Sequence, residues 1–198
     1  MADSVRPSPA KVALRTVQGS GPGTATSIDA PLVRAARRGD RDAFRRLHDR
    51  YARMVHAILV ARVPFGEAAD LAQDVFVLAL ARLDGLREDA AFGGWLAMIA
   101  RNRAADFHRG KRETAELDEE AHAAPPRPTA EAAEVLAAIA ALPEAYRETL
   151  LMRLLEGMSG PEIAAQTGLT PDSVRVNLHR GMKLLREKLD PAGDGEAP

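Results

Sequence analysis

Cysteine is absent from this sequence, so the chain forms neither disulfides nor thiolate metal sites. Aromatic residues are also scarce, at 4% of the 198 residues, and runs of β-branched residues are missing. The residues that dominate are Ala, Leu, Arg and Glu, which favour helices. No apolar run approaches the roughly 18 to 20 residues that cross a bilayer, and the N-terminus lacks an apolar signal core. We therefore expect an all-α, cytoplasmic protein that is not inserted in a membrane.

An excess of charge of one sign is also missing, because the formal net charge is −1 at pH 7. The net charge therefore neither indicates nor excludes a nucleic-acid partner, and the information lies in how the charges are distributed. The apolar content of 46% can build cores, and the length suits one ordinary domain or two small ones.

Composition divides the chain into two helical domains with flexible ends. Residues 1–28 and 190–198 are rich in small and polar residues without an apolar period, which predicts disordered tails. Residues 113–130 are acidic and then proline-rich, which is typical of a flexible linker. We therefore predict one helical domain over residues 29–112 and a second over residues 131–189.

The first predicted domain opens with two helices. Asp29 is the predicted N-cap of the first helix, with Pro31 in its first turn, and Asp40 is the predicted N-cap of the second. The second helix repeats apolar residues at helical spacing as far as Leu59 and breaks near Pro64. Arginines, including Arg50 and Arg53, are expected on its outer surface.

A third helix is predicted from Glu67 to Leu83. Its apolar residues form two stripes, which predicts packing on two sides. The stripes are Leu71, Val75 and Leu78, and Phe76, Leu80 and Leu83. Asp70, Gln73 and Asp74 lie along the remaining edge, and these residues alone favour an ordinary solvated strip over a functional one. A polar loop from Asp84 to Ala90 follows.

A fourth helix is predicted from Phe92 to Arg112. Its apolar stripe is Phe92, Trp95, Leu96 and Ile99. Its opposite face is cationic and carries Arg101, His108, Arg109, Lys111 and Arg112. A basic stripe on a helix that buries its other side suits a polyanion, although a solvated basic face remains the alternative.

The second predicted domain reads as a helix-turn-helix preceded by two helices. Val135 to Leu142 form a short amphipathic helix, and Pro143 opens the next. The core face of that next helix is expected to be Tyr146, Leu150, Leu151, Leu154 and Leu155, and Gly157 ends it. Ser159 is the predicted N-cap of a short helix. Gly168 supplies a tight turn, Leu169 is expected to fill the corner, and Thr170 is expected to cap a last helix that starts at Pro171.

The last helix has one face for packing and one for a groove. Val174, Leu178, Gly181 and Leu185 form the packing face, where Gly181 allows close approach to a neighbour. The other face carries Asp172, Ser173, Arg175, Val176, His179, Arg180, Lys183 and Arg186. In a major groove, Arg175 suits a guanine edge and Val176 a thymine methyl, whereas the later cations suit phosphates. A helical hairpin that contacts protein is the alternative.

Several of these stretches resemble bacterial RNA polymerase sigma factors of the sigma-70 family. DLAQDVF at Asp70 to Phe76 and WLAMIARNRAADFHR at Trp95 to Arg109 resemble the second region of these factors, with its start at Gly39 to Leu47. The run from Leu142 to Leu189 is similar to the fourth region. Two such regions joined directly by a short linker resemble the extracytoplasmic-function (ECF) group, and the likeness covers Asp29 to Leu189.

The resemblance implies roles for particular residues. Asp70, Gln73 and Asp74 would dock on the clamp helices in the largest subunit of core RNA polymerase. The flap of polymerase is a second expected contact of the chain. The loop Asp84 to Ala90 would hold bases of the nontemplate strand that are turned out of the duplex. The minus-ten candidates are Trp95, Arg101, Asn102, His108 and Arg109. The minus-thirty-five candidates are Asp172, Ser173, Arg175, Val176, His179, Arg180 and Lys183.

The resemblance also sets expectations about partners. Promoter DNA is one, and an anti-sigma factor is another, because many relatives are held inactive by such a protein. No cofactor and no metal are expected. Asp106 matches the family pattern, but its place near Arg103 suits a structural ion pair as well as a DNA contact.

Other classes of function stay open on the residues alone. A helix-turn-helix regulator could bind DNA without polymerase, and a helical adaptor could bind only protein. An enzyme is less well supported, because His48, Asp49 and His56 lie on an amphipathic helix without a ligand cluster. Asp70 and Asp74 likewise lack the signs of a pocket.

Overall fold

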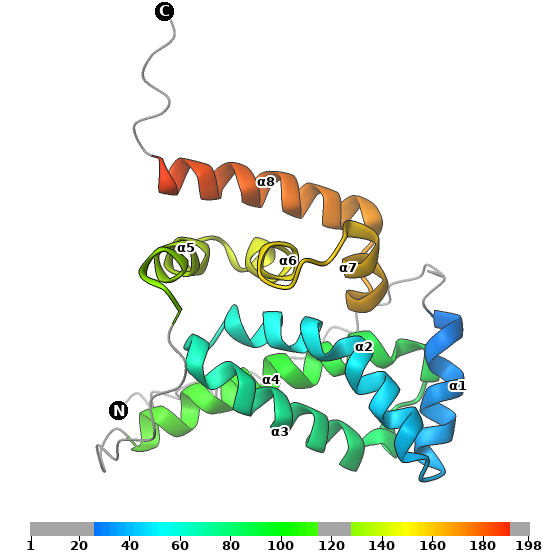
Figure 1. The fold of residues 1–198 in the computed structure, drawn as a ribbon. Helices are drawn as coiled ribbons and strands as arrows, with labels where there is room; N and C mark the ends of the chain where they lie inside the picture. The colour runs from blue at the N-terminus through cyan, green and yellow to red at the C-terminus, as the bar shows by residue number, and fades with distance from the viewer. Residues whose placement is uncertain (1–25, 115–127, 191–198) are drawn as a thin grey trace, which may run out of the picture.

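The computed structural model describes residues 26–114 and 128–190, and every regular element in these ranges is helical (Figure 1). Most of the predicted tails and linker lies outside the described residues, but α1 includes residues 26–28 of the first predicted tail, and α4 and α5 include residues 113–114 and 130 of the predicted linker. The α-helices are α1 Thr26–Arg37, α2 Arg41–Val60, α3 Ala68–Ala81, α4 Phe92–Thr114, α5 Ala130–Ala140, α6 Glu144–Leu154, α7 Gly160–Thr167 and α8 Pro171–Leu189. Short 3-10 turns are η1 Phe65–Glu67, η2 Leu83–Gly85 and η3 Asp89–Ala91. The predicted all-α class is confirmed.

Helices α1 to α4 form the first module, which lies beneath α5 to α8 in Figure 1. Its core is built on the apolar faces of α2 and α4, where Leu47, Tyr51, Phe92 and Leu96 are at most 1% exposed. Burial of these large side chains is the main force that holds the module together. Asp40 caps α2 as predicted, because its carboxylate accepts a hydrogen bond from the Ala43 N–H at 3.0 Å.

Asp29 does not cap α1, so that prediction was wrong. The helix begins at Thr26, and Asp29 lies inside it with 1% of its surface exposed. Its carboxylate accepts a hydrogen bond from the Tyr51 hydroxyl, and the Arg50 Nε lies 3.2 Å from the other carboxylate oxygen. Burial, and then Asp29, raises the pKa of Tyr51 well above its ordinary value. The Arg50 side chain therefore lies against this buried cluster and not on the outer surface of α2, where it was predicted.

Helix α3 packs against two helices, α2 and α4. Leu71 and Val75 of its first predicted stripe, and Phe76 and Leu83 of its second, are buried as predicted. Leu80, however, is 52% exposed, and its neighbour Val77 is 68% exposed. The prediction failed at Leu80 because periodicity identifies apolar positions and does not say whether a neighbour covers each of them.

Helices α5 to α8 form the second module, and its helix-turn-helix follows the predicted caps. The Ser159 hydroxyl accepts from the Glu162 N–H while the Glu162 carboxylate accepts from the Ser159 N–H, which makes a capping box. Gly168 ends α7 with a φ of +76°, a conformation that favours glycine, and the Thr170 hydroxyl caps α8.

Some apolar residues of the second module lie outside its core. Leu150 and Leu151 are buried as predicted, but Leu154 is 46% exposed and Leu155 is 39% exposed. Leu169 is also 39% exposed, so it does not fill the corner of the turn. Gly181 does allow close approach, because a Cβ there would lie 2.9 Å from Leu150 Cδ1.

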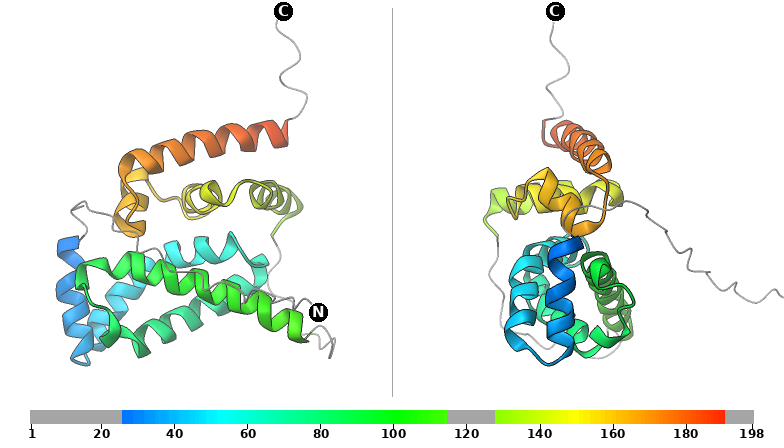
Figure 2. Two further views of the ribbon diagram at one scale, coloured as in Figure 1. Left: turned by 180° about the vertical axis from the view of Figure 1, so that it is seen from behind. Right: turned by 90° about the vertical axis from the view of Figure 1, so that its right-hand side faces the viewer.

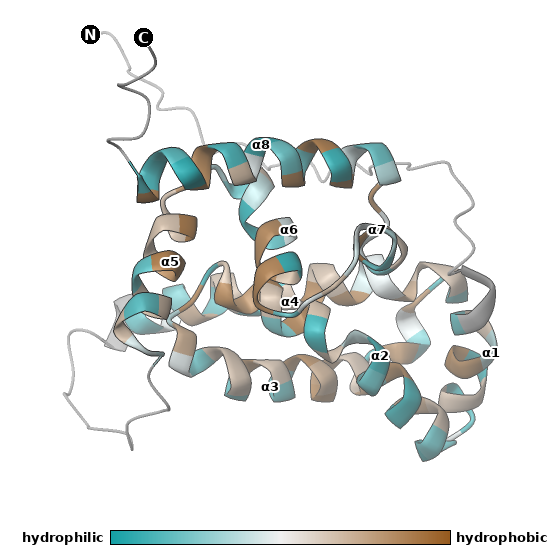
Figure 3. Cartoon of the chain, turned by 45° about the horizontal axis from the view of Figure 1, so that its top comes forward, coloured by the Kyte–Doolittle hydropathy of each residue, from teal (hydrophilic) through white to brown (hydrophobic). Residues whose placement is uncertain are grey.

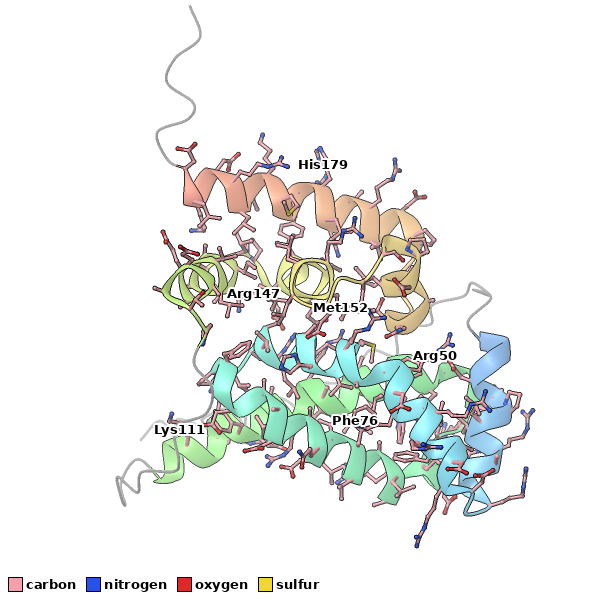
Figure 4. The ribbon with its side chains drawn as sticks, viewed as in Figure 1. Arg50, Phe76, Lys111, Arg147, Met152 and His179 are labelled. Atoms are coloured by element: carbon pink, nitrogen blue, oxygen red, sulfur yellow. The ribbon has the colours of Figure 1, made fainter. Side chains whose placement is uncertain are left out.

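The two modules pack against one another through α2 and α4 below and α6 and α7 above (Figures 1 and 2). Met152, which is fully buried, lies on the side of α6 that faces α2 (Figure 4). Gly93 in α4 is pressed against the second module, since a Cβ there would lie 2.4 Å from the backbone oxygen of Gln166. We call this contact surface the module interface.

Candidate nucleic-acid and protein interfaces

The outer face of α8 carries the side chains predicted to enter a DNA groove. Asp172, Ser173, Arg175, Val176, His179, Arg180, Lys183 and Arg186 are all exposed. Hydrophilic residues follow this face in Figure 3, and His179 points away from α6 in Figure 4. Val174 and Leu185, which are buried, fix the opposite face against the rest of the module. The helix therefore presents a continuous, mostly basic surface from its N-terminus onward.

Ion pairs on this face are local and weak. Arg175 contacts Asp172 one turn earlier at 3.0 Å, and both side chains are about four-fifths exposed. Lys183 and Glu187 are 3.8 Å apart. Exposed pairs of this kind contribute at most about 1 kcal/mol, so a stronger anionic partner can displace them.

A second exposed stripe runs along α3. Asp70, Gln73, Val77 and Leu80 repeat at helical spacing and are all exposed, and we call them the docking strip. Sequence reasoning placed the two polar residues here and missed the two apolar ones, although Val77 lies at i+7 from Asp70. Exposed apolar side chains flanked by polar ones are typical of a protein contact surface.

Asp74 lies at the edge of the docking strip and is already paired. Its carboxylate accepts hydrogen bonds from Arg103 Nη2 at 2.7 Å and Nε at 3.2 Å. Arg103 therefore ties α3 to α4 and does not pair with Asp106, which instead contacts Arg109. Of the two alternatives for Asp106, an ion pair with Arg103 is therefore not formed.

Four of the five minus-ten candidates on α4 have surroundings that fit the prediction of a contact surface or leave it possible. Asn102 and Arg109 are exposed toward solvent, together with Met98, which the sequence reasoning did not single out. His108 is exposed, and one of its ring nitrogens lies 2.7 Å from the Arg62 carbonyl oxygen. Trp95 is half-buried against Phe92.

Arg101 is the candidate whose surroundings differ most from the prediction. It was expected on a wet basic face, but it makes a two-point contact with Glu148 of α6, at 2.9 Å and 2.7 Å. This contact raises the pKa of Arg101 above its ordinary value. Glu148 also accepts from Arg62, so one carboxylate of the second module holds two arginines of the first.

Other polar contacts extend the module interface. The Arg53 guanidinium donates to the Glu156 carbonyl at 3.1 Å, and His56 Nδ1 lies 2.6 Å from the Glu156 carboxylate. Arg53 also lies 3.5 Å from the Glu162 carboxylate of α7, so arginines of the first module face acids of the second and the interface is charge-complementary. His56 is accounted for by this contact, and the described residues contain no group of three or more His, Asp or Glu side chains arranged to hold a metal.

The loop before α4 is held by α1. Residues 83–91, here called the 83–91 loop, contain η2 and η3. Leu83 and Leu86 are buried, whereas Asp84, Gly85, Arg87 and Glu88 are exposed. The segment predicted to hold bases, Asp84 to Ala90, is therefore anchored by Leu86 and by Leu83 just before it, and it has an exposed polar rim. None of the described helices has both the length and the apolarity of a membrane span.

Family comparisons match both modules. Residues 47–114 match the family described as Sigma-70 region 2, and residues 132–185 match Sigma-70, region 4. The chain is 30% identical to the ECF RNA polymerase sigma-E factor of Escherichia coli, across 82% of this chain and 95% of that protein. It is also 30% identical to the ECF RNA polymerase sigma factor BldN of Streptomyces coelicolor, across 80% of this chain and 64% of that protein.

A solved structure agrees with these matches. CnrH, solved in complex with the cytosolic domain of CnrY, aligns with a TM-score of 0.56 and 28% identity. The alignment covers 83% of this chain and 99% of that chain. Both modules of the present structure therefore have counterparts in one known protein.

Proposed function

The chain belongs to the ECF RNA polymerase sigma factors, and from this premise we propose how its two modules divide the work of starting transcription. A sigma factor binds core RNA polymerase and directs it to promoter DNA, which it recognises and opens. Residues 29–112 would bind polymerase and the minus-ten element, and residues 131–189 the minus-thirty-five element. The chain would act in the cytoplasm, by binding and not by catalysis.

The docking strip is the proposed contact with the clamp helices of polymerase. Asp70 and Gln73 supply polar contacts, and the exposed Val77 and Leu80 supply apolar area that polymerase would cover. Asp74 would act at the edge of the strip while it remains paired with Arg103. The flap of polymerase is the proposed second contact, made through the second module.

The outer face of α8 is the proposed reader of the minus-thirty-five element. The observation that supports this most strongly is the exposed basic face that begins at the N-terminus of a helix capped by Thr170. Arg175 is the proposed base reader, since a bidentate arginine–guanine contact discriminates by about 1 to 3 kcal/mol. Asp172, Ser173, Val176 and His179 would line the same groove, and Arg180 and Lys183 would contact phosphates.

The minus-ten element would be held by α4 and the 83–91 loop. Asn102, His108 and Arg109 are exposed in the structure and would contact the nontemplate strand, with Trp95 as a half-buried aromatic surface for a base. Arg101 would join them only after Glu148 has released it. Asp106 would act through Arg109, which it contacts.

Run-off transcription with reconstituted polymerase tests the proposal. Core polymerase with the chain is expected to start at defined sites on DNA from the chain's own genome, and core alone is not. Arg175→Ala should weaken binding to the upstream element by about 1 to 3 kcal/mol without affecting polymerase binding. Lys188→Ala, at the exposed far end of α8, is the matched control. Equal losses for both variants would argue against base reading by Arg175.

Pull-down with a clamp-helix fragment tests the docking strip separately. Replacement of Asp70 and Gln73 by Ala should reduce capture of the chain. Unchanged capture would reject the strip.

An inhibitory protein partner is also proposed for this chain. The support is that many ECF factors are held by anti-sigma factors, and that CnrH was solved with a second protein. Purification of the tagged chain from its native cells should yield a second protein in equal amount that blocks run-off transcription. A purified chain that is active and alone in every growth condition would refute this.

A further inference from the structure

We propose that Arg37 of α1 is a positioning residue for minus-ten recognition, because its guanidinium fixes the backbone of the 83–91 loop. This inference rests on the proposed function, in which the loop holds bases turned out of the duplex. Arg37 itself would touch no base, and its effect would come through the loop that it holds.

One guanidinium contacts the loop at three places. Arg37 Nε donates to the Leu83 carbonyl at 3.1 Å, Nη2 donates to the Leu86 carbonyl, and Nη1 donates to the Asp89 carboxylate at 2.6 Å. The side chains of Arg37 and Asp89 are 24% and 17% exposed, so water competes little for these donors. The planar guanidinium with its fixed donors is suited to such a three-point contact, whereas a lysine ammonium concentrates its donors at one nitrogen.

The loop needs these partners because it has little internal support. Within it, the Leu86 N–H donates to the Leu83 carbonyl at 3.1 Å and the Ala91 N–H donates to the Glu88 carbonyl at 2.9 Å. Leu83 and Leu86 anchor its first half in the core, but an apolar anchor does not define the direction of a carbonyl group. Arg37 adds a second donor at the Leu83 carbonyl, a donor at the Leu86 carbonyl and a contact with Asp89, and these contacts define the path of the loop from Leu83 to Asp89.

The path of the loop sets the orientation of its exposed residues. Asp84, Gly85, Arg87 and Glu88 point to solvent between the residues that Arg37 holds. Discrimination between bases requires these groups to be held to within a fraction of an ångström. Arg34 also reaches Asp89, at 3.3 Å, but it is 54% exposed and contacts the loop at this one place.

Base selectivity is the measurement that separates positioning from stability. Holoenzyme reconstituted with the full chain would transcribe a promoter library randomised over the minus-ten element, and the transcripts would be sequenced. Arg37→Ala is expected to reduce selectivity between bases at this element about tenfold or more while upstream-element selectivity and polymerase affinity are retained. Arg37→Lys should fail to restore it, because the charge alone cannot make the three contacts.

Arg38→Ala is the matched control, because Arg38 is adjacent, carries the same charge and is exposed. Asp89→Asn is the second variant; it removes the charge from only one of the three acceptors that Arg37 contacts, and from the pair of Asp89 with Arg34, and should produce a smaller loss of selectivity. If Arg37→Ala or Asp89→Asn lowers transcription equally from all promoters and keeps the base preferences of the wild-type chain, the inference is overturned. A wild-type chain without any minus-ten selectivity would instead overturn the proposed function.

Discussion

Loss of the Glu148 carboxylate should separate the two modules. Glu148 is the acid that contacts two arginines across the module interface, and its side chain is 13% exposed. Glu148→Ala would leave Arg62 and Arg101 without their shared partner. Arg62 is 16% exposed and water reaches it poorly, although it keeps its contact with the exposed Glu144, whereas Arg101 is 40% exposed and can be rehydrated.

The size of the effect follows from these contacts. A hydrogen bond to a charged group contributes about 1.5 to 3 kcal/mol, and the exposure of Arg101 places its share at or below the lower limit. The loss for both arginines is therefore about 2 to 4 kcal/mol, which shifts the equilibrium toward separated modules by about 30- to 700-fold.

Spin-label distances can measure the separation directly, because the chain has no native cysteine. Labels on cysteines introduced at Arg46 of α2 and Lys188 of α8, both exposed, report the spacing of the modules. Glu148→Ala should broaden and lengthen the distance distribution, whereas Glu134→Ala, an exposed acid on α5, should not. An unchanged distribution in Glu148→Ala would refute the reasoning.

Glu148→Ala is also expected to change the binding of DNA. Arg101, once released, should strengthen binding to single-stranded nontemplate DNA, and the gain should disappear in the double variant Glu148→Ala, Arg101→Ala. A gain that survives removal of Arg101 would show that the arginine is not the group released.

Three further predictions concern single sites. Val77→Ser with Leu80→Ser should weaken binding to a clamp-helix fragment by about 1 to 3 kcal/mol without lowering the melting temperature, because both side chains are exposed. Hydrogen bonds from Ser159 lower the pKa of Glu162, so stability from this capping box is present above the ordinary pKa and is lost as pH falls through the lowered one. Glu162→Gln should flatten the melting temperature measured against pH in acid, and an unchanged profile would contradict it. Gly181→Ala should destabilise the second module by about 1 to 2 kcal/mol in urea unfolding. The added Cβ would lie 2.9 Å from Leu150 Cδ1, and the cost of this clash should exceed the gain in helix propensity. A stabilised variant would contradict this prediction.

The features predicted correctly from sequence are those with local causes. Asp40, Ser159 and Thr170 each cap the helix that follows, and Gly168 adopts the left-handed conformation. These arrangements depend on residues within four positions of one another, so a single sequence contains all the information they need. The packing face of α8 follows for the same reason, through helical periodicity.

The features that were missed depend on contacts between distant parts of the chain. Arg101 is 47 residues from Glu148, and Arg37 is 49 residues from Leu86. Periodicity placed Arg101 on a basic face, but it could not indicate that an acid of the second module covers that face. Leu80 was assigned to a core by the same periodicity, which could not indicate that none of the described helices covers it.

The glycine at position 93 makes the fit between the modules partly independent of ions. Salt screens the charged contacts of exposed residues such as Arg53, with a Debye length of about 8 Å at physiological ionic strength. It leaves unchanged the steric match in which the backbone of Gln166 fills the space that a side chain would take at Gly93. The two halves of this protein should therefore stay partly associated even in concentrated electrolyte. Their separation along promoter DNA would then require binding energy from the contacts with polymerase and DNA.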